Sequence, residues 1–286
     1  MAECRAGNLL GLQLLVYKLT SVKEHLVRKE EDIQRILSIV LSKTTAELYA
    51  SGDYELSTSE ERLLEDLVTK RSKGYPFAYI AKTQGFYEHD FIVSEDVLIP
   101  RPETELLIEI VKAKFTEKNN FKVLDMGTGS GIIAISLKSI FKDWSITATD
   151  ISEKALNIAR QNIEKILSSR DIDLYLSDWF NELSHQKYNL IISNPPYIAE
   201  GDKHLKDLEY EPISALTSGK DGMDSINNII NNAPKFLEKG GFLLLEHGYD
   251  QAEAVRDLLK KDFHNIKNYQ DLSGNDRATI AQVRIF

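Results

Sequence analysis

The first quarter of the chain repeats its hydrophobic residues at the spacing of amphipathic helices. Leucine and valine recur every three or four positions over residues 9–19, and isoleucine, leucine and valine do so over residues 33–41. A third helix is expected to begin where a serine precedes a carboxylate, the pattern of a capped helix start, either at Ser57 with Glu60 or at Ser59 with Glu61. The pattern predicts a small helical bundle over residues 1–75.

A different pattern follows the bundle. Residues 75–98 contain Pro76, several aromatic residues and an alternation of apolar and polar positions around Phe91 and Val93. Such alternation is typical of short strands. We predict a β-hairpin linker over residues 76–98 that joins two domains.

From Leu106 onward, short apolar runs alternate with longer runs of helical period, which is typical of a parallel sheet covered by helices on both faces. The predicted strands are residues 121–126, 145–150, 171–177, 188–193 and 242–246, and the predicted helices are residues 132–141, 153–167, 225–237 and 251–261. Residues 265–286 should add two strands around the turn at residues 273–276 and close the sheet in an antiparallel manner. We therefore predict an α/β domain over residues 99–286.

Composition narrows the functional classes. The chain has 286 residues and 42% hydrophobic residues, enough for one large α/β domain and a smaller one. Its formal net charge of -9 disfavours a broad surface for nucleic-acid phosphates, so stable nucleic-acid binding is not expected. The single cysteine, Cys4, cannot form an internal disulfide, and the six scattered histidines lack the spacing of metal ligands. We predict no metal site and a cytoplasmic location.

Membrane association is not expected either. Residues 9–19 form the only early apolar stretch, and it is too short to span a bilayer. Lys18, Lys23 and Glu24 follow it without a small-residue cleavage site, unlike a secretory signal.

A glycine-rich loop follows the first predicted strand of the α/β domain. The loop contains Gly127, Thr128, Gly129, Ser130 and Gly131, and the next helix is predicted to begin directly after it. Glycines allow a tight turn and a close approach of the backbone to a ligand, while free N–H groups at a helix start can donate hydrogen bonds to a negative group. The G-x-G-x-G spacing differs from the G-x-G-x-x-G loop that serves a dinucleotide pyrophosphate, which favours a methionine-derived cofactor over NAD.

Two acidic residues after neighbouring strands complete the predicted cofactor site. Asp150 ends the next strand about 20 residues after Gly131, the distance expected for a carboxylate that binds ribose hydroxyls. It could instead cap the following helix, a role that Ser152 could fill equally well. Asp178 and Trp179 follow the third strand, where they could bind the adenine amino group and stack on the base. Alternatively, Trp179 and Phe180 pack the edge of the core.

The fourth strand ends in a motif with chemistry of its own, Asn194, Pro195, Pro196 and Tyr197. A planar amide or aromatic amino nitrogen is a poor nucleophile because its lone pair is delocalised. Asn194 Oδ1 and the Pro195 carbonyl could each accept one N–H of such an NH₂ group and aim its lone pair at a methyl donor. Pro196, which has no N–H, would stiffen the loop, and Tyr197 would pack on the flat target group. The alternative is a rigid Pro-Pro turn without catalytic role.

The motif resembles that of amino-group methyltransferases, which modify adenine or glutamine, and further segments resemble one family among them. These segments are residues 99–105, 178–180, 215–222, 245–249 and 271–277, and together with the glycine loop and residues 194–197 they resemble the HemK/PrmC family over residues 72–286. The hairpin residues 81–86 depart from the glycine and acidic residue usual in that family. The amino-terminal bundle resembles the family only in being helical.

The resemblance implies a Rossmann-like class I methyltransferase fold with a seven-stranded, mostly parallel sheet, S-adenosylmethionine as cofactor and S-adenosylhomocysteine as product. It implies methylation of N5 of the glutamine in the Gly-Gly-Gln motif of peptide chain release factors, with the bundle contacting the release factor away from the reaction. The expected cofactor residues are Gly127, Thr128, Gly129, Ser130, Gly131, Asp150, Asp178, Trp179 and Asn194. The expected substrate residues are Arg101, Asn194, Pro195, Pro196 and Tyr197, of which Asn194, Pro195 and Tyr197 are the expected catalytic residues.

Two rival functions remain at this point. An adenine-N6 methyltransferase would need a basic region to hold a flipped base, and the sequence shows no such region. A non-catalytic cofactor sensor would have no use for Asn194.

Overall fold

The chain divides into two units between Ala81 and Lys82. The computed structural model describes residues 21–26, 32–168, 171–184 and 186–285. The helix predicted over residues 9–19 lies outside the described residues. No helix within the described ranges is long and apolar enough to cross a membrane.

The first unit is helical. Its helices are α1 (Val22–Leu26), α2 (Ile33–Leu41), α3 (Thr45–Ala50), α4 (Thr58–Ser72) and α5 (Phe77–Ala81). They bury a small core that includes Ile36, Leu37, Leu48 and Leu64. The helical pattern expected over residues 33–41 is confirmed by α2.

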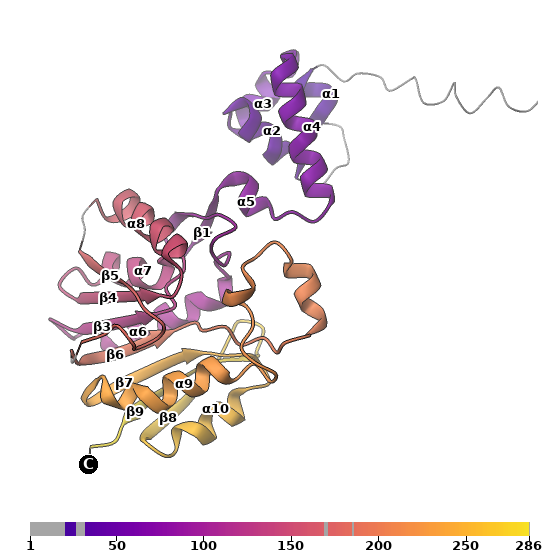
Figure 1. Cartoon of the computed structure of the whole chain (residues 1–286). Coiled ribbons are helices and arrows are strands. Elements are labelled where there is room, and N and C mark those ends of the chain that lie inside the picture. The colour runs from indigo at the N-terminus through magenta and orange to yellow at the C-terminus, as the bar shows by residue number, and fades with distance from the viewer. Residues whose placement is uncertain (1–20, 27–31, 169–170, 185, 286) are drawn as a thin grey trace, which may run out of the picture. The chain divides into compact units, whose positions relative to one another are not determined.

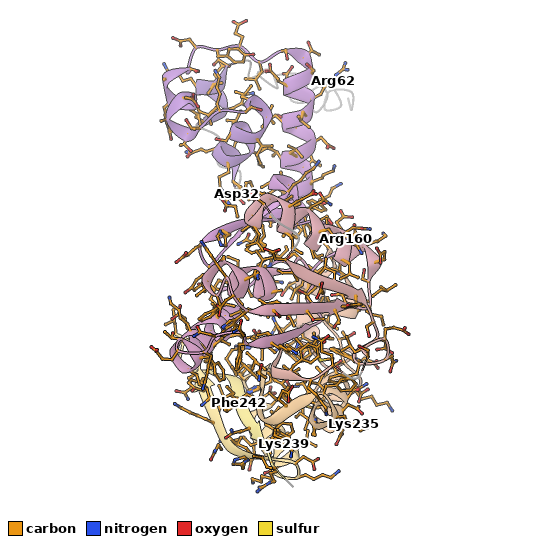
Figure 2. All side chains as sticks on the ribbon, turned by 90° about the vertical axis from the view of Figure 1, so that its left-hand side faces the viewer. Asp32, Arg62, Arg160, Lys235, Lys239 and Phe242 are labelled. Atoms are coloured by element: carbon orange, nitrogen blue, oxygen red, sulfur yellow. The ribbon has the colours of Figure 1, made fainter. Side chains whose placement is uncertain are left out.

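Caps and one ion pair define the first unit further. Of the two candidate starts for α4, the structure has Ser57 as N-cap, with its hydroxyl accepting from the Glu60 N–H and the Glu60 carboxylate accepting from the Ser57 N–H. A similar capping box, which the sequence analysis missed, starts α3 at Thr44. Asp32, labelled in Figure 2, forms an ion pair with Arg71 at 2.9 Å and so joins the start of α2 to the end of α4.

The predicted hairpin linker needs a correction. Residues 77–81 form α5 instead of extended chain, because Pro76 suits a helix start and its carbonyl accepts the N–H of Ile80. The hairpin itself is confirmed as β1 (Thr83–Phe86) and β2 (His89–Ile92). Asn162 of α8 (Glu153–Leu167) holds it, since the Asn162 side chain accepts from the Ile92 N–H and donates to the Ile92 carbonyl.

The second unit contains a seven-stranded sheet with the order β5-β4-β3-β6-β7-β9-β8. The strands are β3 (Lys122–Met126), β4 (Ser145–Asp150), β5 (Ile172–Leu176), β6 (Tyr188–Ser193), β7 (Leu237–Glu246), β8 (Phe263–Gln270) and β9 (Asp276–Val283). Strands β3 to β7 run parallel, and β9 lies antiparallel between β7 and β8. The predicted fold class is confirmed. The strand order reverses between β3 and β6, the position at which open α/β sheets bind ligands.

Helices cover both faces of this sheet (Figure 1). The helices α6 (Glu105–Phe115), α7 (Ile132–Ile140) and α8 pack on one face, and α9 (Asp224–Asn232) and α10 (Ala252–Leu259) pack on the other. The helices differ from the prediction in two places. Helix α6 was not predicted, and the helix expected over residues 225–237 ends at Asn232. Pro234, which has no N–H, stands in a 3-10 turn there, and β7 already begins at Leu237.

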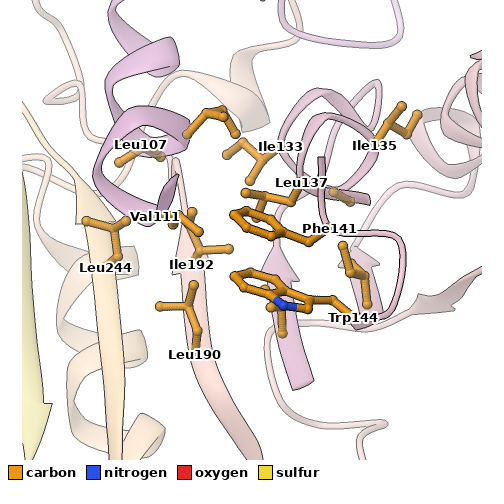
Figure 3. Close-up of a cluster of buried hydrophobic side chains, with 14 of the residues drawn as sticks. Leu107, Val111, Ile133, Ile135, Leu137, Phe141, Trp144, Leu190, Ile192 and Leu244 are labelled. Atoms are coloured by element: carbon orange, nitrogen blue, oxygen red, sulfur yellow. The ribbon is translucent and has the colours of Figure 1, made fainter. Parts of the chain in front are cut away.

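The core on the first face supports the strands that carry the loops described below. Phe141 stacks on Trp144 with ring centroids 3.9 Å apart, against Leu190 and Ile192 of β6 (Figure 3). The Trp144 indole N–H donates to the Lys118 carbonyl, so that the buried ring has its polar group satisfied. Strands β3 and β6, whose carboxyl ends carry these loops, thereby pack on a close-packed core.

Candidate functional site

The glycine loop takes a backbone form that only glycine adopts without strain. Gly127, Gly129 and Gly131 have φ values of 68°, 56° and 87°. A Cβ atom on Gly131 would lie 2.9 Å from Ile135 Cδ1, so this glycine also allows close packing within α7. Thr128 and Ser130 between them are buried. The loop therefore presents backbone instead of side chains to a ligand.

Asp125, which was predicted only as part of a strand, forms hydrogen bonds to both ends of this loop. Its Oδ2 accepts from the Thr128 hydroxyl at 2.6 Å and from the Ala134 N–H at 3.2 Å, which joins both ends of the loop. The side chain is fully buried, and burial raises its pKa to about 7. A carboxylate directly before a glycine loop was the signal that could have identified it.

Asp150 at the end of β4 supports the same loop from the neighbouring strand. One carboxylate oxygen accepts from the Gly129 N–H and the other from the Ser152 N–H, both at 2.9 Å. Burial raises the pKa of Asp150, and these N–H groups oppose that rise. The cap of α8 is Ser152, whose hydroxyl accepts from Ala155. The backbone N–H of Ile151 also interacts with this carboxylate, which still keeps acceptor capacity for a further donor such as a ribose hydroxyl.

The two aromatic residues after β5 have different surroundings. Phe180 is buried and stacks on Phe236, with centroids 4.6 Å apart, and so belongs to the core. Trp179 is half-buried and borders a pocket together with the exposed Asp178. The backbone of Trp179 is left-handed, with φ 51°, which is unusual for a bulky residue.

The pocket has a volume of about 350 Å³ and lies at the carboxyl ends of the parallel strands. It is within the range for small-molecule sites. It brings together the predicted residues Gly127, Gly129, Asp150, Asp178, Trp179, Asn194 and Pro196. Two stretches that were not among the predicted site residues add to its wall, residues 96–98 after the hairpin and the segment that contains Pro212, Ser214, Ala215 and Thr217.

Six predicted site residues do not line this pocket: Arg101, Thr128, Ser130, Gly131, Pro195 and Tyr197. Arg101 forms an ion pair with the buried carboxylate of Glu211, which also accepts the Ile99 N–H. This ion pair attaches the wall segment that begins at Pro212. Arg101 thus has an internal partner that the sequence did not reveal.

Side chains from distant elements fix the motif of residues 194–197. The Asn194 Nδ2 donates to the Thr104 hydroxyl at 3.0 Å. The Tyr197 hydroxyl donates to Glu246 at 3.3 Å, and the Tyr197 carbonyl accepts from Gln251. Burial raises the pKa of Tyr197, so its hydroxyl stays neutral. The Asn194 side chain lies at the pocket with its Oδ1 available, because among the described residues the only bond of the amide goes from Nδ2.

A second cavity in the described part of this unit does not combine these groups. A larger groove of about 570 Å³ lies near the amino ends of the strands, where Lys239 and Phe242 are labelled in Figure 2, but it contains none of the predicted site residues. Within the described ranges no group of three or more histidine, cysteine, aspartate or glutamate side chains could hold a metal ion.

Comparisons with known proteins agree with this geometry. Residues 101–210 match the methyltransferase small domain, and residues 21–81 match the PrmC N-terminal domain. The release factor glutamine methyltransferase of Buchnera aphidicola subsp. Acyrthosiphon pisum is 41% identical, covering 90% of this chain and 93% of that protein. Its namesake in Escherichia coli K12 is 37% identical, covering 88% of this chain and 91% of that protein.

Solved structures share the fold at low sequence identity. A methyltransferase from Pyrococcus furiosus superposes with a TM-score of 0.55 at 20% identity, covering 76% of this chain and all of that chain. The 16S rRNA N2 G1207 methyltransferase of T. thermophilus, solved with AdoMet and guanosine, superposes with a TM-score of 0.53 at 16% identity, covering 71% of this chain and 50% of that chain.

Proposed function

This chain belongs to the family of release factor glutamine methyltransferases, and we propose that it methylates the side-chain amide nitrogen of the glutamine in the Gly-Gly-Gln motif of peptide chain release factors. One observation carries the proposal. One pocket is lined by the glycine loop, by Asp150, whose carboxylate can bind ribose hydroxyls, and by the amide of Asn194. The first two features suit a nucleoside cofactor, and the third suits an NH₂ group as methyl acceptor.

The cofactor that fits this pocket is S-adenosylmethionine. Asp150 has lone pairs for ribose hydroxyls, the Trp179 ring borders the pocket for an adenine, and residues 127–131 allow the backbone to approach the amino-acid part. When bound, S-adenosylmethionine supplies an electrophilic methyl group on its sulfonium. The T. thermophilus methyltransferase solved with AdoMet shares the general fold of the second unit.

The chain's own contribution to the reaction is to orient the acceptor nitrogen. Asn194 Oδ1, which lies at the pocket, accepts one N–H of the glutamine amide, and the carbonyl of the adjacent Pro195, although Pro195 does not line the pocket, accepts the other. Together they turn the nitrogen lone pair towards the methyl group. As the nitrogen loses its conjugation and becomes positive, both acceptors bind its hydrogens more strongly. The proton leaves after methyl transfer, so no general base is needed. Pro196 keeps the motif rigid.

Adenine is the alternative acceptor because its amino group has the same planar form. The family membership favours glutamine, and the net charge of -9 adds a penalty for any acceptor carried on a phosphate backbone.

We further propose that the helical unit recognises the folded release factor and that chemistry belongs to residues 99–286. Residues 21–81 match the PrmC N-terminal domain, and the described part of the unit exposes Tyr49 and Leu63, which suit a protein contact. Contacts remote from the reaction lower KM without changing kcat. Because release factors act in the cytoplasm, we place the enzyme there.

The test uses the purified full chain, S-adenosylmethionine and a purified release factor, followed by mass spectrometry of the Gly-Gly-Gln peptide. We expect one methyl group on the glutamine and none on a release factor whose glutamine is replaced by alanine. A short Gly-Gly-Gln peptide should have a kcat/KM lower by about tenfold or more, which corresponds to ~1.4 kcal/mol of remote binding. Methylation of nucleic acid in place of the factor would overturn the function, and equal efficiency on the peptide would overturn only the division of roles.

A further inference from the structure

The side-chain amide of an asparagine can take two orientations in which the oxygen and the nitrogen exchange places. The two have nearly the same shape, and only one of them suits the proposed reaction. With Oδ1 towards the pocket, Asn194 accepts an N–H of the acceptor amide. With the amide reversed, Nδ2 would present donors to a group that itself has only donors on that side. Catalysis therefore requires that something in the protein selects the orientation of Asn194.

The neighbour that makes this selection is Thr104. Its hydroxyl accepts from Asn194 Nδ2 at 3.0 Å, and its side chain is fully buried. Thr104 lies between the 3-10 turn η1 (Pro102–Thr104) and α6, a position at which a threonine often caps the helix, but it makes no such cap bond. A threonine hydroxyl has one proton, so the selection depends on where that proton goes.

Glu246 at the carboxyl end of β7 can accept this proton, since it is 1% exposed and its buried Oε2 has no hydrogen-bond partner among the described residues. Burial raises the pKa of Glu246, and its interaction with the Thr104 hydroxyl opposes that rise and favours the carboxylate form. A carboxylate offers only acceptors, so it draws the Thr104 proton to itself and leaves the hydroxyl lone pairs for Asn194 Nδ2. The reversed amide would place the Asn194 oxygen against the Thr104 oxygen with no proton between them.

We propose that Thr104 and Glu246 are positioning residues that hold the Asn194 amide with its oxygen towards the acceptor substrate. The proposal rests on the function proposed above and extends it to two residues outside the Asn-Pro-Pro-Tyr motif. It also gives a role to the buried carboxylate of Glu246, since the proposed reaction needs no general base.

The surroundings of Glu246 make the arrangement sensitive to pH. The groups that face it are Thr104 and Glu103 from η1, Tyr197 from the loop after β6, and Arg277 from β9. Burial raises the pKa of Glu246 to about 7, while Thr104, Arg277 and Tyr197 oppose that rise and Glu103 adds to it. A protonated Glu246 no longer requires the Thr104 proton, so both orientations of Asn194 become accessible. Activity should be present above this pKa and decline as the pH falls through it.

The experiment compares Thr104→Val, which removes the hydroxyl at constant shape, with Thr104→Ser, which keeps it. Thr104→Val should lower kcat on the release factor about 10- to 100-fold, the range found when a group that orients a metal ligand is removed. Its KM for S-adenosylmethionine should stay within about twofold of the wild-type value, because the cofactor contacts are unchanged. Thr104→Ser should recover most of kcat.

The pH profile of kcat separates positioning from a general structural role. Wild-type kcat should fall as the pH decreases through about 7, whereas Thr104→Val and Glu246→Gln should lose this dependence. Cofactor calorimetry verifies that each variant is folded. A Thr104→Val variant with wild-type kcat, or with equal losses of kcat and cofactor affinity, would overturn the positioning role. An inactive wild-type enzyme would instead refute the proposed function, so the two failures are distinguishable.

Discussion

The two walls of the pocket are constructed in different ways. The proposed cofactor wall is built around backbone, a loop of three glycines with left-handed φ that Asp125 holds on one side and Asp150 on the other, with the Asp150 carboxylate as the proposed ribose ligand. The proposed substrate wall depends on a side chain, the Asn194 amide, whose orientation is set by a hydroxyl from a different element. Backbone geometry has no alternative rotamers, whereas an amide can be reversed.

This difference suggests that the two walls act at different stages of the reaction. A wall that binds the ribose and the amino-acid part of a cofactor interacts similarly before and during methyl transfer, so it affects affinity. A wall that accepts hydrogens from a nitrogen becoming positive interacts more strongly in the transition state, so it affects rate. Damage to each wall should therefore appear in a different kinetic constant.

The largest expected effect comes from the substrate wall. Asn194→Ala removes one acceptor of the developing charge and should lower kcat by about 10² to 10³, or about 3 to 4 kcal/mol, by analogy with the loss of one preorganised hydrogen-bond partner in other enzymes. Steady-state titration of the release factor at saturating cofactor measures the loss. The matched control is Asn231→Ala, an exposed asparagine of α9. Retention of wild-type kcat by Asn194→Ala would mean that the wall is misassigned.

A smaller effect, on a different constant, should come from the cofactor wall. Asp150→Ala removes the acceptor of the Gly129 and Ser152 N–H groups together with the proposed ribose ligand. Hydrogen bonds to a charged group contribute about 1.5 to 3 kcal/mol each, so KM for S-adenosylmethionine should rise about 10- to 100-fold. With saturating cofactor, kcat should be nearly unchanged.

Cofactor titration at saturating release factor measures this effect, with Asp173→Ala on exposed β5 as the matched control. Calorimetry should also show that wild type binds S-adenosylmethionine and not NAD. A loss of kcat with unchanged cofactor affinity in Asp150→Ala would contradict the assignment of the two walls.

The two walls also differ in how far the sequence predicts them. Strands β4 and β6 were predicted at both ends, because short segments rich in apolar and β-branched residues and bounded by polar residues are typical of strands. The loops that follow them were located correctly for the same reason. In contrast, α6 was missed because its apolar residues, which include Leu106, Leu107, Ile108, Ile110 and Val111, surround much of the helix and give no clear period.

Contacts between distant segments could not be predicted. The bond from Asn194 to Thr104 spans 90 positions of the chain, and the Arg101 ion pair with Glu211 spans 110. Such pairs depend on which strands become neighbours, and a single sequence fixes hydrophobic period but not strand order. Local signals identified the cofactor wall, because its glycines and Asp150 follow strands directly, whereas the support of the substrate wall remained hidden.

The smallest expected effect tests how much the left-handed backbone of the glycine loop requires glycine for stability. Gly129→Ala places a methyl group where no atom lies within 4 Å, so its cost should come only from φ 56° and lower the free energy of unfolding by about 1 to 2 kcal/mol. Gly131→Ala has the same left-handed backbone and adds the 2.9 Å approach to Ile135, so it should be less stable than Gly129→Ala. Gly85→Ala in β1, which has no left-handed φ and only an ordinary contact, is the control and should change stability by less than about 0.5 kcal/mol. Denaturant unfolding of the full-length variants gives the three values. Equal stability of all three variants would show that the left-handed backbone does not constrain the cofactor wall, and the contrast with the substrate wall would then lose its physical basis.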